Sequence, residues 1–460
     1  MNLAKPIAIL GAGLAGLTAA SRLKKRDIPF EVYEASNKVA GLASSFKDKD
    51  GFTHDFGAHF ITNRLANAVG IGDQCRVVKH YGEAVWLKGK SYNYPFGLIE
   101  IPQMSLSFIK SKLNQIGASN PPASAAEWFR KNYGQALADQ VALPLIEAWS
   151  GVPADELSPA VGESLPGSIL QTLYLKMASV LSGRAVACGY NREKPEMPSV
   201  WHVYPNHGVS TICEKLMEGI EDSIMLNSPV KEIMVENGKV TAIKVNDEIK
   251  PVSAVISTAP ANILAQMVKG SHVLDYAKEF KFRPMIFINL RLEGRRFLPD
   301  TVEWFPEKDL PFFRLTEVTR SMPWMAPEGK SIITADIGCT KDEPFWTMED
   351  DKLIALCLEN LERVLPGIKE KFLGGDVLRT GFSYPVFLNK YEKERQQFEK
   401  STNIDNLLSI GRNGEFGHRF MEDVYWRTCQ KVDDLIQNNA MNGRTVISNE
   451  HQNKSVNTES

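Results

Sequence analysis

Residues 7–34 read IAILGAGLAGLTAASRLKKRDIPFEVYE, and this stretch decides the fold of the chain. The apolar run 7–10 is typical of a strand that is buried on both faces of a parallel sheet. The pattern of residues 14–26 predicts a helix, and the run 30–33 predicts a second parallel strand. Strand, glycine turn, helix and strand thus follow one another in the order of a nucleotide-binding βαβ unit.

The three glycines of the turn have separate mechanical roles. Gly11 permits the tight turn, Gly13 lets a pyrophosphate approach the backbone, and Gly16 lets the helix pack closely on the strand. The helix N-terminus offers unpaired N–H groups and a partial positive charge to phosphates. Glu34 lies 18 residues after Gly16, at the end of the second strand, where a carboxylate accepts hydrogen bonds from a ribose. An ordinary strand–helix turn without a ligand is the alternative, but the ordered set of features favours a bound dinucleotide.

The composition is that of an ordinary globular protein. The chain has 460 residues, 43% of them hydrophobic, and a net charge of −2, so we expect two or three domains and no nucleic-acid partner. No apolar run reaches the ~18 residues of a transmembrane segment, and the early first strand leads us to expect no signal peptide. The 6 cysteines without a CxxC pair indicate reduced thiols and a cytoplasmic location. The 8 histidines show no ligand spacing, so we expect no metal site.

The sequence pattern changes several times between strand-like and helix-rich stretches, which predicts a discontinuous nucleotide-binding domain. Strand-like runs return at 224–256, with a hairpin turn at Asn237-Gly238, and again at 407–410. Between them lie a hairpin-like stretch at 86–95 and a helix-rich region. In that region Ser124 and Glu127 form a capping box before a helix that we expect to extend to Val141.

We therefore expect an α/β fold, in which a mixed α+β substrate domain with a helical subdomain interrupts a Rossmann-like domain. The nucleotide-binding domain is predicted to comprise residues 1–75, 216–270 and 386–436. The substrate domain is predicted to comprise 76–215 and 271–385. The polar tail 437–460 lacks periodicity, which predicts disorder.

Small residues crowd the segments 39–45 and 51–59, as expected where backbone passes close to a large flat ligand. The chain has no second GxGxxG, although flavoproteins that take electrons from NADPH in a separate domain usually carry one. This absence argues against a pyridine-nucleotide reductase.

The segments 11–16, 41–43, 55–60 (DFGAHF) and 411–423 (GRNGEFGHRFMED) together resemble the FAD-binding flavin amine oxidase superfamily. Within it, the chain is most similar to protoporphyrinogen oxidase-like proteins and UDP-galactopyranose mutases, from Pro6 to about Leu435. The resemblance implies a glutathione-reductase-type FAD-binding domain and FAD as the cofactor.

The resemblance also implies a set of cofactor-binding residues, which follow the FAD molecule from end to end. The pyrophosphate would lie against Gly11, Gly13, Leu14, Ala15 and Gly16, and the adenosine against Glu34, Ala35 and the backbone of Val230. The phosphates, ribityl chain and flavin would lie against Gly41, Leu42, Ala43, Gly57, Ala58, His59 and Thr258. Gly411 and Arg412 would meet the pyrophosphate, and the helix that begins at Met421 and Glu422 would point its N-terminus at the flavin pyrimidine edge.

Two segments depart from the family pattern. Ala40-Gly41-Leu42 stands where the family often has Gly-Gly-Arg, so the cofactor phosphate has one charge partner fewer. His418-Arg419-Phe420 stands where the mutases carry tyrosines, which argues against mutase-type binding of a diphosphate.

Three residues are candidates for catalysis. His59 would tune flavin N5 or shape the substrate pocket, with a structural histidine as the alternative, and Tyr384 would donate a hydrogen bond to substrate or simply pack. Arg314 occupies a segment similar to one that holds a phosphate-binding arginine in the mutases, with an ion pair to Glu317 or Glu303 as its alternative. Other residues considered for substrate binding are Arg283, Arg291, Arg320, Arg379 and, for stacking on a nucleobase, Trp149.

Three functions remain open at this point. An FAD-dependent oxidoreductase would take hydride from a small organic substrate and pass electrons to oxygen, a quinone or a carrier protein. A redox-neutral mutase would instead use reduced FAD on a nucleotide sugar and would need cations for a diphosphate. A flavin-binding partner protein without catalysis is the third alternative.

Overall fold

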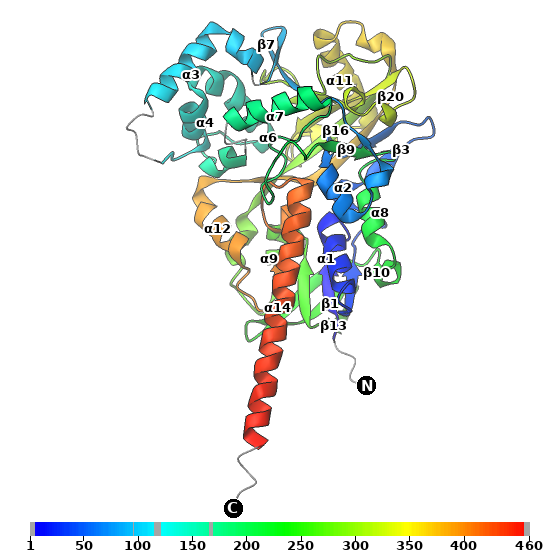
Figure 1. The fold of residues 1–460 in the computed structure, drawn as a ribbon, viewed down its shortest axis with the longest axis vertical. Helices are drawn as coiled ribbons and strands as arrows, with labels where there is room; N and C mark the ends of the chain where they lie inside the picture. Colours follow the sequence, from blue (N-terminus) through cyan, green and yellow to red (C-terminus); the bar gives the residue numbers. More distant parts are fainter. Residues whose placement is uncertain (1–4, 95, 115–120, 165–168, 455–460) are drawn as a thin grey trace, which may run out of the picture.

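The computed structural model describes residues 5–94, 96–114, 121–164 and 169–454, which form a lower and an upper part (Figure 1). The lower part is built on a five-stranded parallel sheet in the order β10-β2-β1-β14-β21. Its strands come from distant parts of the chain: β1 (Ile7–Leu10), β2 (Phe30–Tyr33), β10 (Ile224–Met225), β14 (Ala254–Ser257) and β21 (Leu407–Ser409). The α/β fold class predicted from the sequence is thus confirmed.

The strand β1 lies in the middle of this sheet. All four of its residues are buried, because apolar side chains pack against both faces of the sheet. On one face lie α1 (Leu14–Lys24) and the long α14 (Met421–Lys454), which contact each other side by side (Figure 1). A four-stranded sheet covers the other face with β11 (Val230–Glu236), β12 (Lys239–Val245), β13 (Glu248–Pro251) and β15 (Val268–Lys269).

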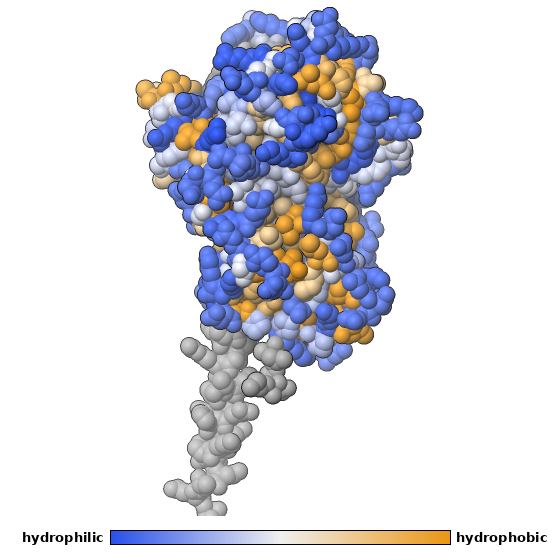
Figure 2. Space-filling model, turned by 90° about the vertical axis from the view of Figure 1, so that its right-hand side faces the viewer, coloured by the Kyte–Doolittle hydropathy of each residue, from blue (hydrophilic) through white to orange (hydrophobic). Residues whose placement is uncertain are grey.

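The upper part contains a seven-stranded sheet in the order β20-β16-β19-β18-β17-β7-β8. Its members are β7 (Glu83–Leu87), β8 (Lys90–Asn93), β16 (Lys281–Glu293), β17 (Val302–Trp304), β18 (Arg314–Glu317), β19 (Lys330–Gly338) and β20 (Phe372–Val386). The helix α11 (Asp350–Val364) packs on β16 and β20. Figure 2 shows that the molecule is narrower where the upper and lower parts meet. The helical subdomain comprises α3 (Pro102–Asn114), α4 (Ala125–Tyr133), α6 (Leu143–Ser150) and α7 (Ile169–Ser182).

The helix expected to extend to Val141 is shorter than predicted. Ser124 caps α4 by accepting a hydrogen bond from the Glu127 amide at 3.3 Å, whereas the Glu127 carboxylate accepts from Ala123 rather than from Ser124. Gly134 then ends α4 with a φ of 81°, a conformation that favours glycine. The chain continues as a separate turn and a π-helix over Ala138–Ala142.

Two stretches differ from the expected domain boundaries. The strand β9 (His202–Pro205) and the helix α8 (Thr211–Met217) share a hydrophobic core with α1, so this part of 76–215 packs with the nucleotide-binding domain. At the other end α14 continues to Lys454, although disorder was predicted from 437. No proline interrupts this stretch, so a helix that packing has nucleated can continue into it. Residues 455–460 lie outside the described residues, and the two-domain division stands as our proposal.

Candidate active site

The glycine turn has the geometry that its sequence predicts. Gly11 has a φ of 98°, and a Cβ added there would lie 2.2 Å from Oγ1 of Thr258, at the end of β14. A Cβ on Gly16 would lie 1.9 Å from the carbonyl oxygen of Gly11, so only glycine lets α1 approach β1 this closely. A Cβ on Gly13 would lie 3.8 Å from the carbonyl oxygen of Ala40, an ordinary contact distance, so this position is less tightly packed than Gly11 and Gly16. The turn at the N-terminus of α1 is where a pyrophosphate would lie.

Further segments complete the wall around this turn. The carboxylate of Glu34 accepts hydrogen bonds from the amides of Ala12 at 2.7 Å and Ser36 at 2.9 Å, which places it at the mouth of the turn. The 3-10 turn Gly41–Ala43 lies against Gly13, because the Ala40 amide donates to the Ala12 carbonyl at 2.9 Å. On the outer side, the backbone just before Val230 is hydrogen-bonded to Glu34 and Ser36. Four segments that are predicted to contact the adenosine and the phosphates thus lie close together.

The segment Gly57–His59 lies between the two parts of the molecule. A Cβ on Gly57 would lie 2.9 Å from the ring of Phe287 and 3.5 Å from Nη2 of Arg314, so glycine lets these two side chains approach the backbone closely. Burial lowers the pKa of His59, with nearby Asp55 acting in the opposite direction. The segment borders a small pocket, which is lined by His54, Asp55, Gly57, Ala58, His59, Phe60, Thr316, Val318, Met322 and Thr334.

Arg314 is paired, but with neither of the two expected acids. Its Nη2 donates to Oδ2 of Asp336, which lies directly opposite it on β19, and its guanidinium lies 5.3 Å from the ring of Trp304. Burial lowers the pKa of Arg314, but Asp336 outweighs that effect and raises it overall. Glu317 points elsewhere because residues three apart on a strand face opposite sides, and it accepts from the Arg296 and Leu298 amides. Glu303 accepts from Ser91.

Tyr384 belongs to a second group of side chains beside Arg314. The guanidinium of Arg412 lies 4.7 Å from the centroid of the Tyr384 ring. Arg412, which was predicted to bind the cofactor, thus lies beside a candidate catalytic residue. The rings of Trp149 and Tyr384 are 5.3 Å apart, and Trp149 meets the ring of His418 at 4.9 Å. Burial and the charge of Arg412 lower the pKa of His418 well below its ordinary value, which keeps this imidazole neutral.

Several buried nitrogens in these two groups lack partners among the residues that the structure describes. They are Nδ1 of His59, Nε of Arg314, Nε of Arg412 and Nε2 of His418. Buried polar atoms are nearly always hydrogen-bonded, so a polar ligand beside these side chains would supply missing partners. The flavin ring carries nitrogen and oxygen atoms that can do so. Together with the glycine turn, these atoms fit the FAD that the sequence implies.

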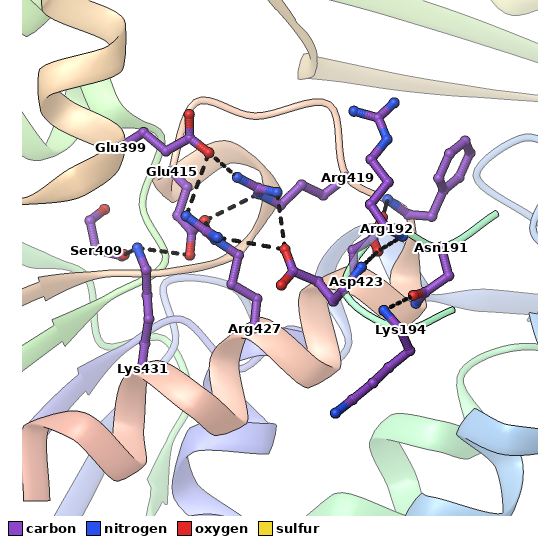
Figure 3. Close-up of polar contacts among 12 residues, drawn as sticks. Asn191, Arg192, Lys194, Glu399, Ser409, Glu415, Arg419, Asp423, Arg427 and Lys431 are labelled. Atoms are coloured by element: carbon purple, nitrogen blue, oxygen red, sulfur yellow. Dashed lines mark hydrogen bonds and ion pairs between the residues drawn. The ribbon is translucent and has the colours of Figure 1, made fainter. Parts of the chain in front are cut away.

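The start of α14 is fixed by an ion-pair network (Figure 3). Glu415, whose side chain is 1% exposed, binds Arg419 at 3.1 Å and Lys431 at 3.1 Å and also pairs with Arg427. Glu399 bridges both arginines. The helix begins at Met421, as predicted, and the Glu422 carboxylate accepts from Thr62 at 2.7 Å and pairs with Arg64 at 2.5 Å.

One polar chain that the sequence analysis did not single out packs against Phe60. Tyr190 donates to Tyr81 at 2.7 Å, and Tyr81 donates to Glu83 at 2.6 Å. These residues carry no motif, and no local signal in the sequence could join positions 109 apart. His418 was noted only as a departure from the mutase pattern, and its place against Trp149 emerges from the fold alone.

A family model for flavin containing amine oxidoreductases matches residues 14–408. The chain belongs to this family. It is 24% identical to the coproporphyrinogen III oxidase of Staphylococcus aureus, over 78% of this chain and 84% of that protein. It is 22% identical to protoporphyrinogen oxidase 2 of Arabidopsis thaliana, over 87% of each. A reduced UDP-galactopyranose mutase has a similar fold, with a TM-score of 0.77 and 20% identity over 95% of this chain and 94% of that one.

Membership of the amine oxidoreductase family confirms several sequence-based predictions. The chain is an enzyme, an FAD-dependent oxidoreductase, and its fold is shared with both groups that the sequence resembles. The alternative of a non-catalytic flavin-binding protein is thereby set aside. Among the described residues, no helix is long and apolar enough to cross a membrane.

Proposed function

We propose that this enzyme oxidises a small, largely apolar organic substrate by passing its hydride to FAD. When bound, FAD supplies a two-electron acceptor at N5. The turn Gly11–Gly16 and Glu34 would hold its pyrophosphate and ribose. The remaining predicted cofactor residues, Ala35, Gly41–Ala43, Gly57–His59, Val230, Thr258, Gly411, Arg412 and the α14 start at Met421, would line the rest of the molecule.

The residues beside the flavin would orient the substrate and exclude water. Tyr384 and Trp149 offer aromatic faces, and Tyr384 has a hydroxyl to orient a polar group of the substrate. A neutral His59 would accept or donate one hydrogen bond without adding charge. Arg314 is held rigidly by Asp336 and would act as a fixed donor rather than a free cation. The electrons would leave to oxygen, a quinone or a carrier protein.

One observation carries this proposal over the mutase alternative: the site has few free cations. Of the five arginines considered for a diphosphate, Arg314 lies in the site, and Asp336 neutralises it. The other four make their polar contacts with the following groups: Arg283 with Gly338 and Glu343, Arg291 with Asp48, Arg320 with Pro299, and Arg379 with Asp350 and Met348. A diphosphate needs more charge compensation than the neutralised Arg314 offers.

Anaerobic mixing of the FAD-loaded enzyme with candidate substrates tests the proposal. Coproporphyrinogen III, named for the Staphylococcus aureus relative, is the first candidate, followed by protoporphyrinogen IX and a panel of amines. We expect one of them to bleach the oxidised-flavin absorbance in a single turnover. If none does, while the dithionite-reduced enzyme interconverts UDP-galactopyranose and UDP-galactofuranose, the oxidoreductase proposal is wrong.

The mutase remains the second candidate because of Arg412. This arginine has no acidic partner among the described residues and lies against Tyr384, where it would attract an anionic group. Titration of the reduced enzyme with UDP decides this point. Binding that Arg412→Met weakens by about tenfold or more would favour the mutase, and no binding would remove it.

A further inference from the structure

We propose that Tyr190, Tyr81 and Glu83 form a proton relay that removes the proton which the substrate loses as its hydride leaves. The proposal rests on the oxidoreductase function, because oxidation of a C–H bond next to an N–H or O–H group releases one proton with each hydride. A redox-neutral mutase would have no net proton to remove. None of the three residues belongs to the predicted catalytic set.

The relay is a continuous chain of hydrogen bonds. The hydroxyl of Tyr190 donates to the hydroxyl oxygen of Tyr81 at 2.7 Å, and the hydroxyl of Tyr81 donates to Oε1 of Glu83 at 2.6 Å. The other carboxylate oxygen of Glu83 accepts from Nε1 of Trp304 at 2.8 Å. Both donors point in one direction, from Tyr190 toward Glu83, as a relay that ends on a carboxylate requires.

The position of Tyr190 gives the chain its starting point. Its ring lies 6.0 Å from that of Phe60 and 5.1 Å from that of Phe420. Phe60 directly follows His59, and Phe420 directly precedes Met421, so Tyr190 lies between the two segments that we expect beside the flavin. Arg314 is close enough for its charge to act on the pKa of Tyr190. The Tyr190 hydroxyl oxygen keeps a lone pair with which to accept a proton.

The segment that carries Tyr190 is fixed from both sides. The carboxylate of Glu196 accepts from the amides of Gly189 at 2.9 Å and Tyr190 at 2.7 Å. Asp423, in the first turn of α14, accepts from the Arg192 amide at 2.7 Å (Figure 3). These charge-assisted bonds tie Tyr190 to the start of the helix that would face the flavin.

The proton balance follows from this geometry. The substrate C–H bond breaks, and its electron pair leaves with the hydrogen as hydride to FAD. The proton on the neighbouring N–H or O–H passes to Tyr190, the hydroxyl proton of Tyr190 passes to Tyr81, and that of Tyr81 passes to Glu83. Burial and the nearby Glu83 raise the pKa of both tyrosines, so each passes on a proton without existing as a phenolate.

The matched variants are Tyr81→Phe, which removes the middle hydroxyl, and Tyr276→Phe as a control. The Tyr276 hydroxyl has no partner among the described residues and lies in another core. In anaerobic single turnover with the candidate substrate that reduces the wild-type flavin, we expect Tyr81→Phe to slow flavin reduction by about 10²-fold and to change its solvent deuterium isotope effect. Tyr276→Phe should leave both unchanged. Glu83→Gln, which keeps an acceptor for Trp304, should have the same effect as Tyr81→Phe.

A readout without turnover tests the chain itself. With 3-fluorotyrosine at position 190, we expect Glu83→Gln to shift the ¹⁹F resonance, and we expect no such shift in a Tyr81→Phe background. If Glu83→Gln leaves the ¹⁹F resonance unchanged, the relay proposal is wrong. It is also wrong if flavin is reduced at the wild-type rate in the Tyr81→Phe variant. If the dithionite-reduced enzyme proves to be a mutase and no candidate reduces the wild-type flavin, the proposed function and the relay both fail, although ¹⁹F coupling would still show the hydrogen-bond chain.

Discussion

At the scale of single residues, Arg314 and Arg412 are two arginines with opposite electrostatic situations. Arg314 pairs with Asp336, whose side chain is fully buried, whereas Arg412 lies on the Tyr384 ring and has no acidic partner among the described residues. Removing one member of a buried ion pair leaves the other charge unpaired. The two arginines therefore contribute differently to stability and to binding.

We predict that Arg314→Met lowers the free energy of unfolding of the FAD-free protein by about 3–5 kcal/mol. Arg412→Met should change that stability by less than about 1 kcal/mol, because it strands no buried charge, and should instead weaken ligand binding. Urea unfolding of both variants measures the difference. The double variant Arg314→Met with Asp336→Leu should regain most of the lost stability. Equal losses for the two single variants would contradict this account of the site.

At the scale of elements, α14 depends on the acid that lies beneath its first turns. Arg419, Arg427 and Lys431 surround Glu415. Burial lowers the pKa of Lys431, and the negative charge of Glu415 acts in the opposite direction. The network thus holds three cations near one buried carboxylate (Figure 3). It fixes the helix start that would face the flavin.

We expect Glu415→Gln to lower the free energy of unfolding by about 3 kcal/mol or more and to weaken FAD binding at the same time. The matched control is Glu399→Gln, in the same network but 30% exposed, for which we expect a loss of about 1 kcal/mol. Thermal unfolding and flavin titration provide the two measurements. Wild-type flavin affinity in the Glu415→Gln variant would show that the ion-pair network does not support FAD binding.

At the scale of the whole molecule, Glu303 makes stability depend on pH. It is 1% exposed on β17, Ser91 donates to one of its oxygens, and the other has no partner among the described residues. Burial raises its pKa from 4.5 to about 7, with Ser91 acting in the opposite direction. The folded state therefore binds this proton more tightly than the unfolded chain does.

The sign of the pH effect follows from that difference. The contribution of protonated Glu303 to stability is fully present below its unfolded pKa and is lost as pH rises through the folded value. We predict that Glu303→Gln gains about 2–3 kcal/mol relative to the wild type between about pH 4 and about pH 8. Urea unfolding across this range measures the difference. Parallel pH profiles for the two proteins would contradict the prediction.

The sequence by itself determined the nucleotide-binding unit and its ligand class. Gly11, Gly16 and Glu34 are informative because their roles depend on neighbours a few residues away, through local turn geometry and helix packing. The resemblance in residues 55–60 and 411–423 extended this to FAD and to the family.

Only the tertiary structure decided which groups meet across the site. Arg314 pairs with Asp336 because β18 and β19 align them in register, and Tyr190 reaches Tyr81 because two distant segments meet in the fold. Register and long-range packing depend on the whole core rather than on adjacent residues. For that reason the neutralised arginine and the polar chain to Glu83 could not be read from the sequence.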